Sequence, residues 1–244
     1  MTRKTLELPL GLSASDIIGG GTSGLALLIP HTQMVIKISH DDPDERERCE
    51  REAIIYERLR ESNIPGSSSL LLGYSGRSEC GGWILLEYAQ NKTIRRYLSI
   101  PDNQPASTIL ISRWAQQSAI ALRFVHANNI AHGDVSCDNF FLDEHLNLRL
   151  GDFTSSSLGL ETCLEQDDIF EFGLAVYEMS TGIQLFKGLY LCPDEKREKI
   201  KHDGLPDLTQ LPVTGLAGTI AKCLQSHYNN VGEVFHDIEN ASQK

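Results

Sequence analysis

The pattern of apolar residues changes near residue 89, and this change divides the chain into two parts with different expected secondary structure. Before it, short apolar runs alternate with turns. The runs 25–29 and 34–38 are separated by four residues beginning with Pro30, which predicts a β-hairpin. Two further strands are expected at 70–72 and 83–88, with a glycine-rich turn between them at 76–82.

One charged helix is expected within this strand-rich part. Pro43 suits the first turn of a helix, and the acidic residues after it suit the positive end of the helix dipole. The helix is predicted to run to about Arg60, and the residues expected to face a core are Ala53, Ile54, Tyr56 and Leu59.

The second part has helical spacing. Apolar residues recur every three or four positions over 107–128, and 167–181 is apolar nearly all round, as in a buried helix. Two more helices are predicted at 193–203 and 214–241. The expected fold class is α+β: a single domain over 1–244, divided into a small β-rich lobe (12–88) and a larger helical lobe (90–241). Clefts between such lobes commonly bind ligands.

Composition narrows the possible functions. The net charge is −11 over 244 residues, which disfavours nucleic-acid binding, and no apolar run is long enough to cross a bilayer. The first residues lack the apolar stretch of a signal peptide, and the six cysteines form no CxxC pair. We therefore expect a cytoplasmic or nuclear protein that is not secreted and has no membrane or nucleic-acid partner.

A glycine-rich segment fits the pattern GxGxxG, which is a weak signal by itself; it consists of Gly19, Gly20, Gly21, Thr22, Ser23 and Gly24. A dinucleotide-binding turn would need a helix directly after its last glycine. Pro30 follows too soon for one, so that interpretation fails. A loop that merely turns the chain remains possible for the segment alone.

Lys37 lies inside an apolar strand, where an ammonium group without an anionic partner is costly. Its partner is therefore a phosphate or a carboxylate. Glu52 is the candidate carboxylate, because it adjoins the apolar stretch of the charged helix and shares a side with Ile55 and Leu59. The alternative is that Glu52 is one more solvated charge.

Two motifs in the second part complete the pattern. His132-Gly-Asp134 is followed by Asn139, and Asp152-Phe-Thr154 follows a pair of short strands. With the glycine loop, Lys37 and Glu52, these motifs resemble the eukaryotic protein kinase domain, including its HRD and DFG elements. A buried helix motif beginning at Asp168 extends the resemblance, which spans roughly residues 12–240.

The resemblance implies ATP and Mg²⁺ as cofactors. The backbone at 19–24 would cover the phosphates and Lys37, held by Glu52, would contact them. Asp152 and Asn139 would hold Mg²⁺, and Asp134 would orient the acceptor hydroxyl. The residues implied to lie around the adenine are Val35, Leu86, Glu87, Ala89 and Phe141.

The chain departs from the family pattern at four places. Gly133 replaces the HRD arginine, Ser136 replaces the catalytic-loop lysine, and Thr154 replaces the DFG glycine. Only 15 residues, 153–167, separate Asp152 from Asp168, and they contain no APE sequence. This gap removes most of the activation segment and the loop that docks a peptide.

Three functions are compatible with these residues. The first is a kinase that acts on a protein hydroxyl, with an unidentified protein substrate. The second is a pseudokinase that binds nucleotide or protein without turnover. The third is a small-molecule kinase, because HGDxxxxN also resembles the loop of aminoglycoside and choline phosphotransferases.

Overall fold

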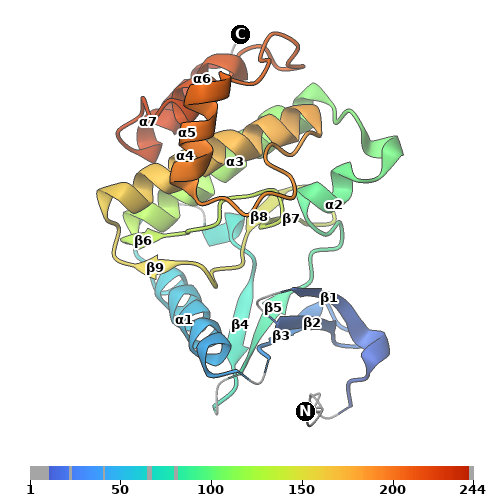
Figure 1. Ribbon diagram of the computed structural model, residues 1–244. Helices are drawn as coiled ribbons and strands as arrows, with labels where there is room; N and C mark the ends of the chain where they lie inside the picture. The colour runs from blue at the N-terminus through green and yellow to red at the C-terminus, as the bar shows by residue number, and fades with distance from the viewer. Residues whose placement is uncertain (1–10, 22–23, 41, 65–67, 80–81, 242–244) are drawn as a thin grey trace. The chain divides into compact units, whose positions relative to one another are not determined.

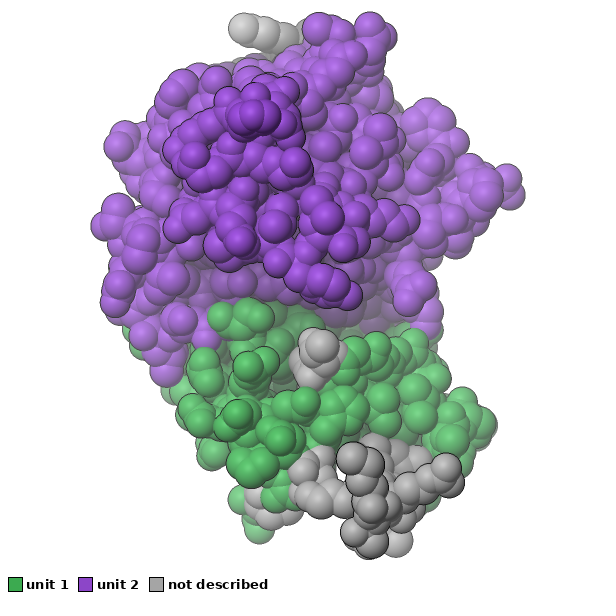
Figure 2. Space-filling view, viewed as in Figure 1, with its two compact units in different colours: residues 1–62, 72–88, 152–155 green, residues 63–71, 89–151, 156–244 purple. Residues whose placement is uncertain are grey.

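The computed structural model describes residues 11–21, 24–40, 42–64, 68–79 and 82–241. The chain forms two compact units, coloured separately in Figure 2. Unit 1 comprises Met1–Ser62, Leu72–Tyr88 and Asp152–Ser155, and unit 2 comprises Asn63–Leu71, Ala89–Gly151 and Ser156–Lys244. The main division lies at residue 88, but 63–71 belongs with the helical unit and 152–155 with the strand-rich unit.

Unit 1 is built on one antiparallel sheet in the order β1-β2-β3-β5-β4 (Figure 1). The strands are β1 (Ile17–Gly21), β2 (Gly24–Leu28), β3 (Met34–Ile38), β4 (Tyr74–Arg77) and β5 (Trp83–Glu87). A short 3-10 turn, η1 (Ala14–Asp16), precedes β1. The expected hairpin of β2 and β3 is confirmed.

The strand expected at 70–72 is wrong. Residues Ser68–Leu70 form a 3-10 turn, η2, and Leu71 makes only an isolated bridge to Leu150. The edge strand is β4, which includes Gly76 from the expected turn. A run of three leucines is too short for periodicity to distinguish a strand from another buried segment.

The charged helix of unit 1, α1 (Pro43–Arg60), has the predicted bounds. Asp42 caps it, because its Oδ1 accepts from the amides of Asp44 at 3.0 Å and Glu45 at 3.4 Å. Its buried face includes Glu52, whereas Ile54 is 39% exposed, so the expectation that Ile54 faces the core is wrong. At 100° per residue, Ile54 lies on the opposite side of the helix from Glu52.

Unit 2 is mainly helical. Its helices are α2 (Ile94–Leu98), α3 (Thr108–Ala127), α4 (Thr162–Thr181), α5 (Pro193–Asp203), α6 (Leu216–Leu224) and α7 (Val231–Ala241). A further 3-10 turn, η3 (Pro101–Asn103), follows α2. The helix α4 packs against α3 and α6 (Figure 1). The α+β class expected from the sequence is therefore confirmed.

Helix bounds in unit 2 agree with the sequence in part. The helices expected at 107–128 and 193–203 are confirmed, and α4 begins five residues before the expected 167. The expectation of a single helix over 214–241 is wrong, because the helical structure is interrupted between the end of α6 at Leu224 and the start of α7 at Val231. The side chain of Asn230 accepts from the amide of Glu233 at 3.2 Å and starts the second helix.

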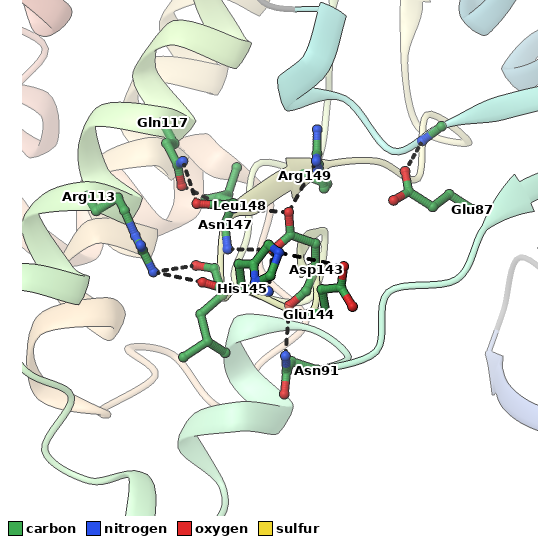
Figure 3. A network of polar contacts seen from close by, with 12 residues as sticks. Glu87, Asn91, Arg113, Gln117, Asp143, Glu144, His145, Asn147, Leu148 and Arg149 are labelled. Carbon is green, nitrogen blue, oxygen red and sulfur yellow. Dashed lines mark hydrogen bonds and ion pairs between the residues drawn. The ribbon is translucent and has the colours of Figure 1, made fainter. Parts of the chain in front are cut away.

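Two small strand pairs support the loops of unit 2: β6 (Ile130–Ala131) with β9 (Ser157–Leu158), and β7 (Phe140–Leu142) with β8 (Leu148–Leu150). Figure 3 shows the polar network at the turn between β7 and β8. Asp143 accepts from the amides of His145 at 2.9 Å and Asn147 at 2.8 Å, and from Arg149 at 3.1 Å. This network fixes the hairpin that leads from Asn139 to Gly151.

Among the helices in the described ranges, none combines the length and the apolar character needed to cross a membrane.

Candidate active site

The charged cluster of unit 1 is centred on Lys37 in β3. Its Nζ donates to Glu52 Oε2 at 2.9 Å and to Asp152 Oδ1 at 2.7 Å. The other oxygen of Glu52 accepts from the amide of Phe153 at 3.1 Å. Glu52 therefore ties Lys37 to the start of the 153–167 segment, and this second contact has no signal in the sequence.

Burial and charge oppose each other in this cluster. Burial disfavours the ammonium form of Lys37, but Glu52 and Asp152 outweigh it and raise the pKa of Lys37 above its ordinary value. Burial raises the pKa of Glu52, which is fully buried, against the pull of Lys37. Lys37 is thus held as a cation at a site where it can contact an anion.

Asp152 is held in an unusual backbone conformation. Its φ is +60°, in the left-handed region that costs a non-glycine residue roughly 1–2 kcal/mol. The Thr154 hydroxyl donates to Asp152 Oδ1 at 2.6 Å, and the Thr154 amide donates to the same oxygen at 3.4 Å. Burial opposes ionisation of Asp152, but Lys37 and Thr154 outweigh it, so its pKa lies below the ordinary value.

The glycine-rich segment joins β1 to β2 as a hairpin, since Gly21 pairs with Gly24, and no helix follows it. Gly24 has φ +120°, and a Cβ there would lie 2.0 Å from the carbonyl oxygen of Ile38. Only glycine fits this position. Gly19, Gly20 and Gly21 are exposed in β1, whereas Thr22 and Ser23 lie outside the described residues.

Of the residues expected around an adenine, Val35 and Leu86 are buried and face each other in the β3–β5 register. The Glu87 amide donates to the carbonyl of Gly73 at 2.7 Å. The Glu87 carboxylate accepts from the Gly73 amide at 3.2 Å, the contact marked at Glu87 in Figure 3. Ala89 is buried and Phe141 is half-buried, both in unit 2.

In unit 2 a buried carboxylate of α4 holds the loop 132–139 through hydrogen bonds to its backbone amides. Asp168 is fully buried and accepts from the amides of His132 at 2.7 Å and Gly133 at 2.8 Å. It also bonds to His126 Nε2 at 2.8 Å. Gly133 has φ +76°, a conformation that glycine adopts without strain.

Further hydrogen bonds fix the candidate functional side chains of this loop. His132 Nδ1 accepts from the amide of Asp134 at 3.3 Å, and its Nε2 lies 3.2 Å from the carbonyl oxygen of Gly151. Asn139 donates its side-chain amide to the carbonyl of Asp134 at 2.8 Å. The Asp134 side chain is exposed. Unit 2 thus brings Asp134 and Asn139 together on one ordered loop.

Glu171 is a loop anchor that sequence reasoning missed. Its Oε2 accepts from the amide of Val135 at 3.2 Å, directly after Asp134. An acid three residues after Asp168, on an apolar helix, was the available signal, because residues at i and i+3 share a helix face.

Several residues of the short 153–167 segment take part in hydrogen bonds and secondary structure. The Ser156 hydroxyl is buried and donates to the carbonyl of His132 at 2.7 Å. β9 then pairs with β6, Leu160 donates its amide to Asn129 Oδ1 at 2.9 Å, and α4 begins at Thr162. The Thr154 hydroxyl is thus a local donor, to Asp152 two residues before it, whereas the Ser156 hydroxyl joins the segment to the loop 132–139, 24 positions earlier in the sequence.

The two candidate metal ligands, Asp152 in unit 1 and Asn139 in unit 2, each offer oxygen, which suits a magnesium ion better than a transition metal. The hydrogen bonds to the Asp152 carboxylate fall on Oδ1, which leaves Oδ2 for a cation. Asn139 supplies a neutral amide oxygen. Among the described residues, no group of three or more His, Cys, Asp or Glu side chains is placed so that it could hold a metal ion. Mg²⁺ commonly binds through one or two protein oxygens together with substrate phosphates.

Residues 12–162, more than half of the chain, match the family model described as "Protein kinase domain". The chain is 30% identical to the serine/threonine-protein kinase pakG of Dictyostelium discoideum over 145 residues, which cover 58% of this chain and 12% of the relative. It is 24% identical to the RAF proto-oncogene serine/threonine-protein kinase of Xenopus laevis over 176 residues (61% and 26%). It is 26% identical to the serine/threonine-protein kinase Nek3 of Oryza sativa over 199 residues (70% and 33%).

The chain thus spans no more than a third of the length of these relatives. The matched region contains Lys37, Glu52, Asp134, Asn139 and Asp152, whereas most of α4 and the helices after it lie beyond it. Together with the α+β fold, the family match shows that this chain belongs to the protein kinase domain family.

Proposed function

We propose that this chain is an ATP- and Mg²⁺-dependent kinase that transfers the γ-phosphoryl group to a hydroxyl of a protein. The observation that carries the proposal is the cluster in which Lys37 bonds to both Glu52 and Asp152. Phosphoryl transfer depends on positioning and charge neutralisation, and this cluster holds a cation beside an ionised carboxylate. The family match and the serine/threonine kinases among the relatives support the same class.

The proposed step is a nucleophilic substitution at the γ-phosphorus of ATP. The acceptor oxygen forms a bond to the γ-phosphorus, and the bond to the β–γ bridging oxygen breaks with its electron pair leaving on ADP. Asp134 accepts the hydroxyl proton or directs it to solvent, and its exposed carboxylate is suited to this role. Lys37 holds the phosphates of the nucleotide.

Asp152 and Asn139 are the residues that would hold Mg²⁺. The ion, when bound, neutralises charge on the phosphate oxygens. The low pKa of Asp152, which burial opposes and Lys37 and Thr154 maintain, keeps this ligand ionised at neutral pH.

Adenine recognition is assigned to backbone groups near the end of β5. The amides of Glu87 and Tyr88 are already used, because they donate to the carbonyls of Gly73 at 2.7 Å and Gln33 at 2.9 Å. We therefore assign the carbonyl of Glu87 and the amide of Ala89 to adenine, with the buried Val35 and Leu86 as apolar contacts and half-buried Phe141 as a third.

A binding module without turnover is the main alternative, and one observation favours it. The Thr154 hydroxyl and Lys37 both occupy Asp152 Oδ1, so a metal could bind this carboxylate through Oδ2 alone. A small-molecule kinase is the other alternative, because the 153–167 segment is too short to carry a peptide-docking loop.

The test is to incubate the purified chain with γ-labelled ATP and Mg²⁺, alone and with casein or myelin basic protein. Label transferred to the chain or to either protein, and lost in Asp134→Asn, is the expected result. ATP binding without transfer identifies a binding module. If ADP appears only with aminoglycosides or choline, the acceptor is a small molecule.

A further inference from the structure

A pocket of about 200 Å³ lies within unit 2 beside the loop that carries Asp134. Four elements form its polar walls. The loop contributes Asp134 and Ser136, α2 contributes Arg95, α5 contributes Lys196, and α4 contributes Glu171 and Glu178. Among these side chains the proposed function gives a role to Asp134 alone, and it assigns none to α5.

The pocket has an excess of negative charge. Its walls hold four carboxylates, on Asp134, Asp138, Glu171 and Glu178, against two cations. A phosphoryl group on an acceptor beside Asp134 would be repelled by these carboxylates unless a cation lies within reach, because like charges in a partly desolvated pocket interact strongly. The identity of that cation therefore decides whether the pocket can hold a phosphorylated group.

Arg95 is committed to other partners. Its guanidinium donates to both carboxylate oxygens of Glu178, at 2.6 and 2.7 Å, and also contacts Asp138. A bidentate pair of this kind is geometrically specific and strong. Arg95 therefore serves to neutralise two of the four acids.

Lys196 has fewer partners than Arg95. Its Nζ donates to Glu171 Oε1 at 3.0 Å, and an ammonium group carries three N–H donors. Its side chain is 20% exposed, so the ammonium can reach an incoming group. Burial raises the pKa of Glu171 to about 7, against the pull of Lys196, so its countercharge is incomplete at neutral pH.

We propose that Lys196 contacts the phosphoryl group carried by the acceptor in this pocket, with Glu171 as the positioning residue that aims it. The cation is thus supplied from α5, whereas the loop itself has Ser136. Lysine is suited to this task because it binds phosphate as a compact point charge. The proposal rests on the proposed function, since it concerns the acceptor side of the same transfer.

The first test measures product binding without turnover. The full chain, labelled with ¹⁵N, is titrated with O-phosphoserine while the amide signals of Val135 and Ser136 are followed, and L-serine serves as the ligand control. Lys196→Ala is expected to weaken O-phosphoserine binding about tenfold or more, the effect of losing a charge-assisted hydrogen bond. Lys196→Arg should restore most of it. Lys201→Ala is the matched control, because Lys201 lies on the same helix with a 70% exposed side chain.

The second test measures transfer with γ-labelled ATP. Lys196→Ala should lower kcat/KM for the protein acceptor about tenfold or more while the affinity for ATP stays unchanged. Unchanged O-phosphoserine binding and unchanged transfer in a folded Lys196→Ala variant would overturn the proposal. If the parent chain transfers no phosphate yet binds O-phosphoserine through Lys196, the kinase proposal fails and the Lys196 site stands. If the parent binds O-phosphoserine no better than serine, the Lys196 site fails whatever the activity.

Discussion

The two sets of candidate functional residues are held in opposite ways. In unit 1, the candidate side chains bind each other directly: Lys37 pairs with Glu52 and with Asp152. In unit 2, the Asp134 side chain is exposed, and its loop is held through backbone amides that donate to Asp168 and Glu171. In unit 1 the same side chains therefore stabilise the fold and form the candidate site. In unit 2 the residues that hold the loop differ from the candidate residue, Asp134, that the loop presents.

Because of this difference, substitutions in the two units differ in whether they change activity alone or activity and stability together. Removing one charge in unit 1 leaves its partners uncompensated, so activity and stability fall together. Asp134 can be changed with little structural consequence, because α4 rather than Asp134 holds the loop. Asp134→Asn is therefore the cleaner probe of chemistry.

The largest expected effect is on the anchor of the unit 2 loop. Asp168→Ala removes the acceptor of two backbone amides and of the buried His126, and should lower the free energy of unfolding by about 3–5 kcal/mol. Urea denaturation measures this, with Asp134→Ala as the control, expected within about 0.5 kcal/mol of the parent. Equal losses in the two variants would show that the loop does not depend on α4.

The next largest effect concerns Lys37. Lys37→Met leaves Glu52 and Asp152 without their cation, and should abolish phosphoryl transfer and lower stability by about 3 kcal/mol. The double variant Lys37→Met with Glu52→Gln should lose less stability than the sum of the single changes, which denaturation of all four proteins measures. Strict additivity would mean that the pair contributes nothing jointly. Asp152→Ala should also abolish transfer, through loss of a metal ligand.

A third prediction concerns pH and Glu171. Because burial raises its folded pKa from 4.5 to about 7, its contribution to stability is fully present below pH 4.5 and is lost as the pH rises through 7. The parent should therefore lose roughly 2–3 kcal/mol between pH 5 and pH 8 relative to Glu171→Gln. Urea titrations across this range measure the difference, and parallel curves for the two proteins would refute the assignment.

The smallest effects are expected in the 153–167 segment. Ser156→Ala removes one buried hydrogen bond and Thr154→Val removes the hydroxyl that contacts Asp152, each costing about 1 kcal/mol. We expect transfer to be independent of phosphorylation in this segment, because Ser156 is buried and Gly133 offers no guanidinium. Alanine at positions 154–157, singly and together, tests this on a fixed acceptor. A loss of rate that acidic residues restore would contradict it.

Local signals in the sequence were sufficient for helix α1 and for the β2–β3 hairpin of unit 1. Asp42 and Pro43 start α1 through contacts within three residues, so its bounds were predictable. Glu52 was identified among several helix acids because its neighbours at i+3 and i+7 are apolar, and the structure places it against Lys37. The roles of these residues toward ATP and Mg²⁺ stay predictions.

Other features of the structure depend on contacts between residues that are far apart in the sequence. Turn, cap and periodicity signals act within a few residues, so they were enough to predict the types of the long periodic elements. They could not predict that Leu71 bridges Leu150, that Glu171 holds Val135, or that Lys196 lines the pocket beside Asp134, because these contacts form only in the folded chain. These contacts join residues 36 to 79 positions apart, and their energy comes from burial and charge pairing that no local pattern encodes.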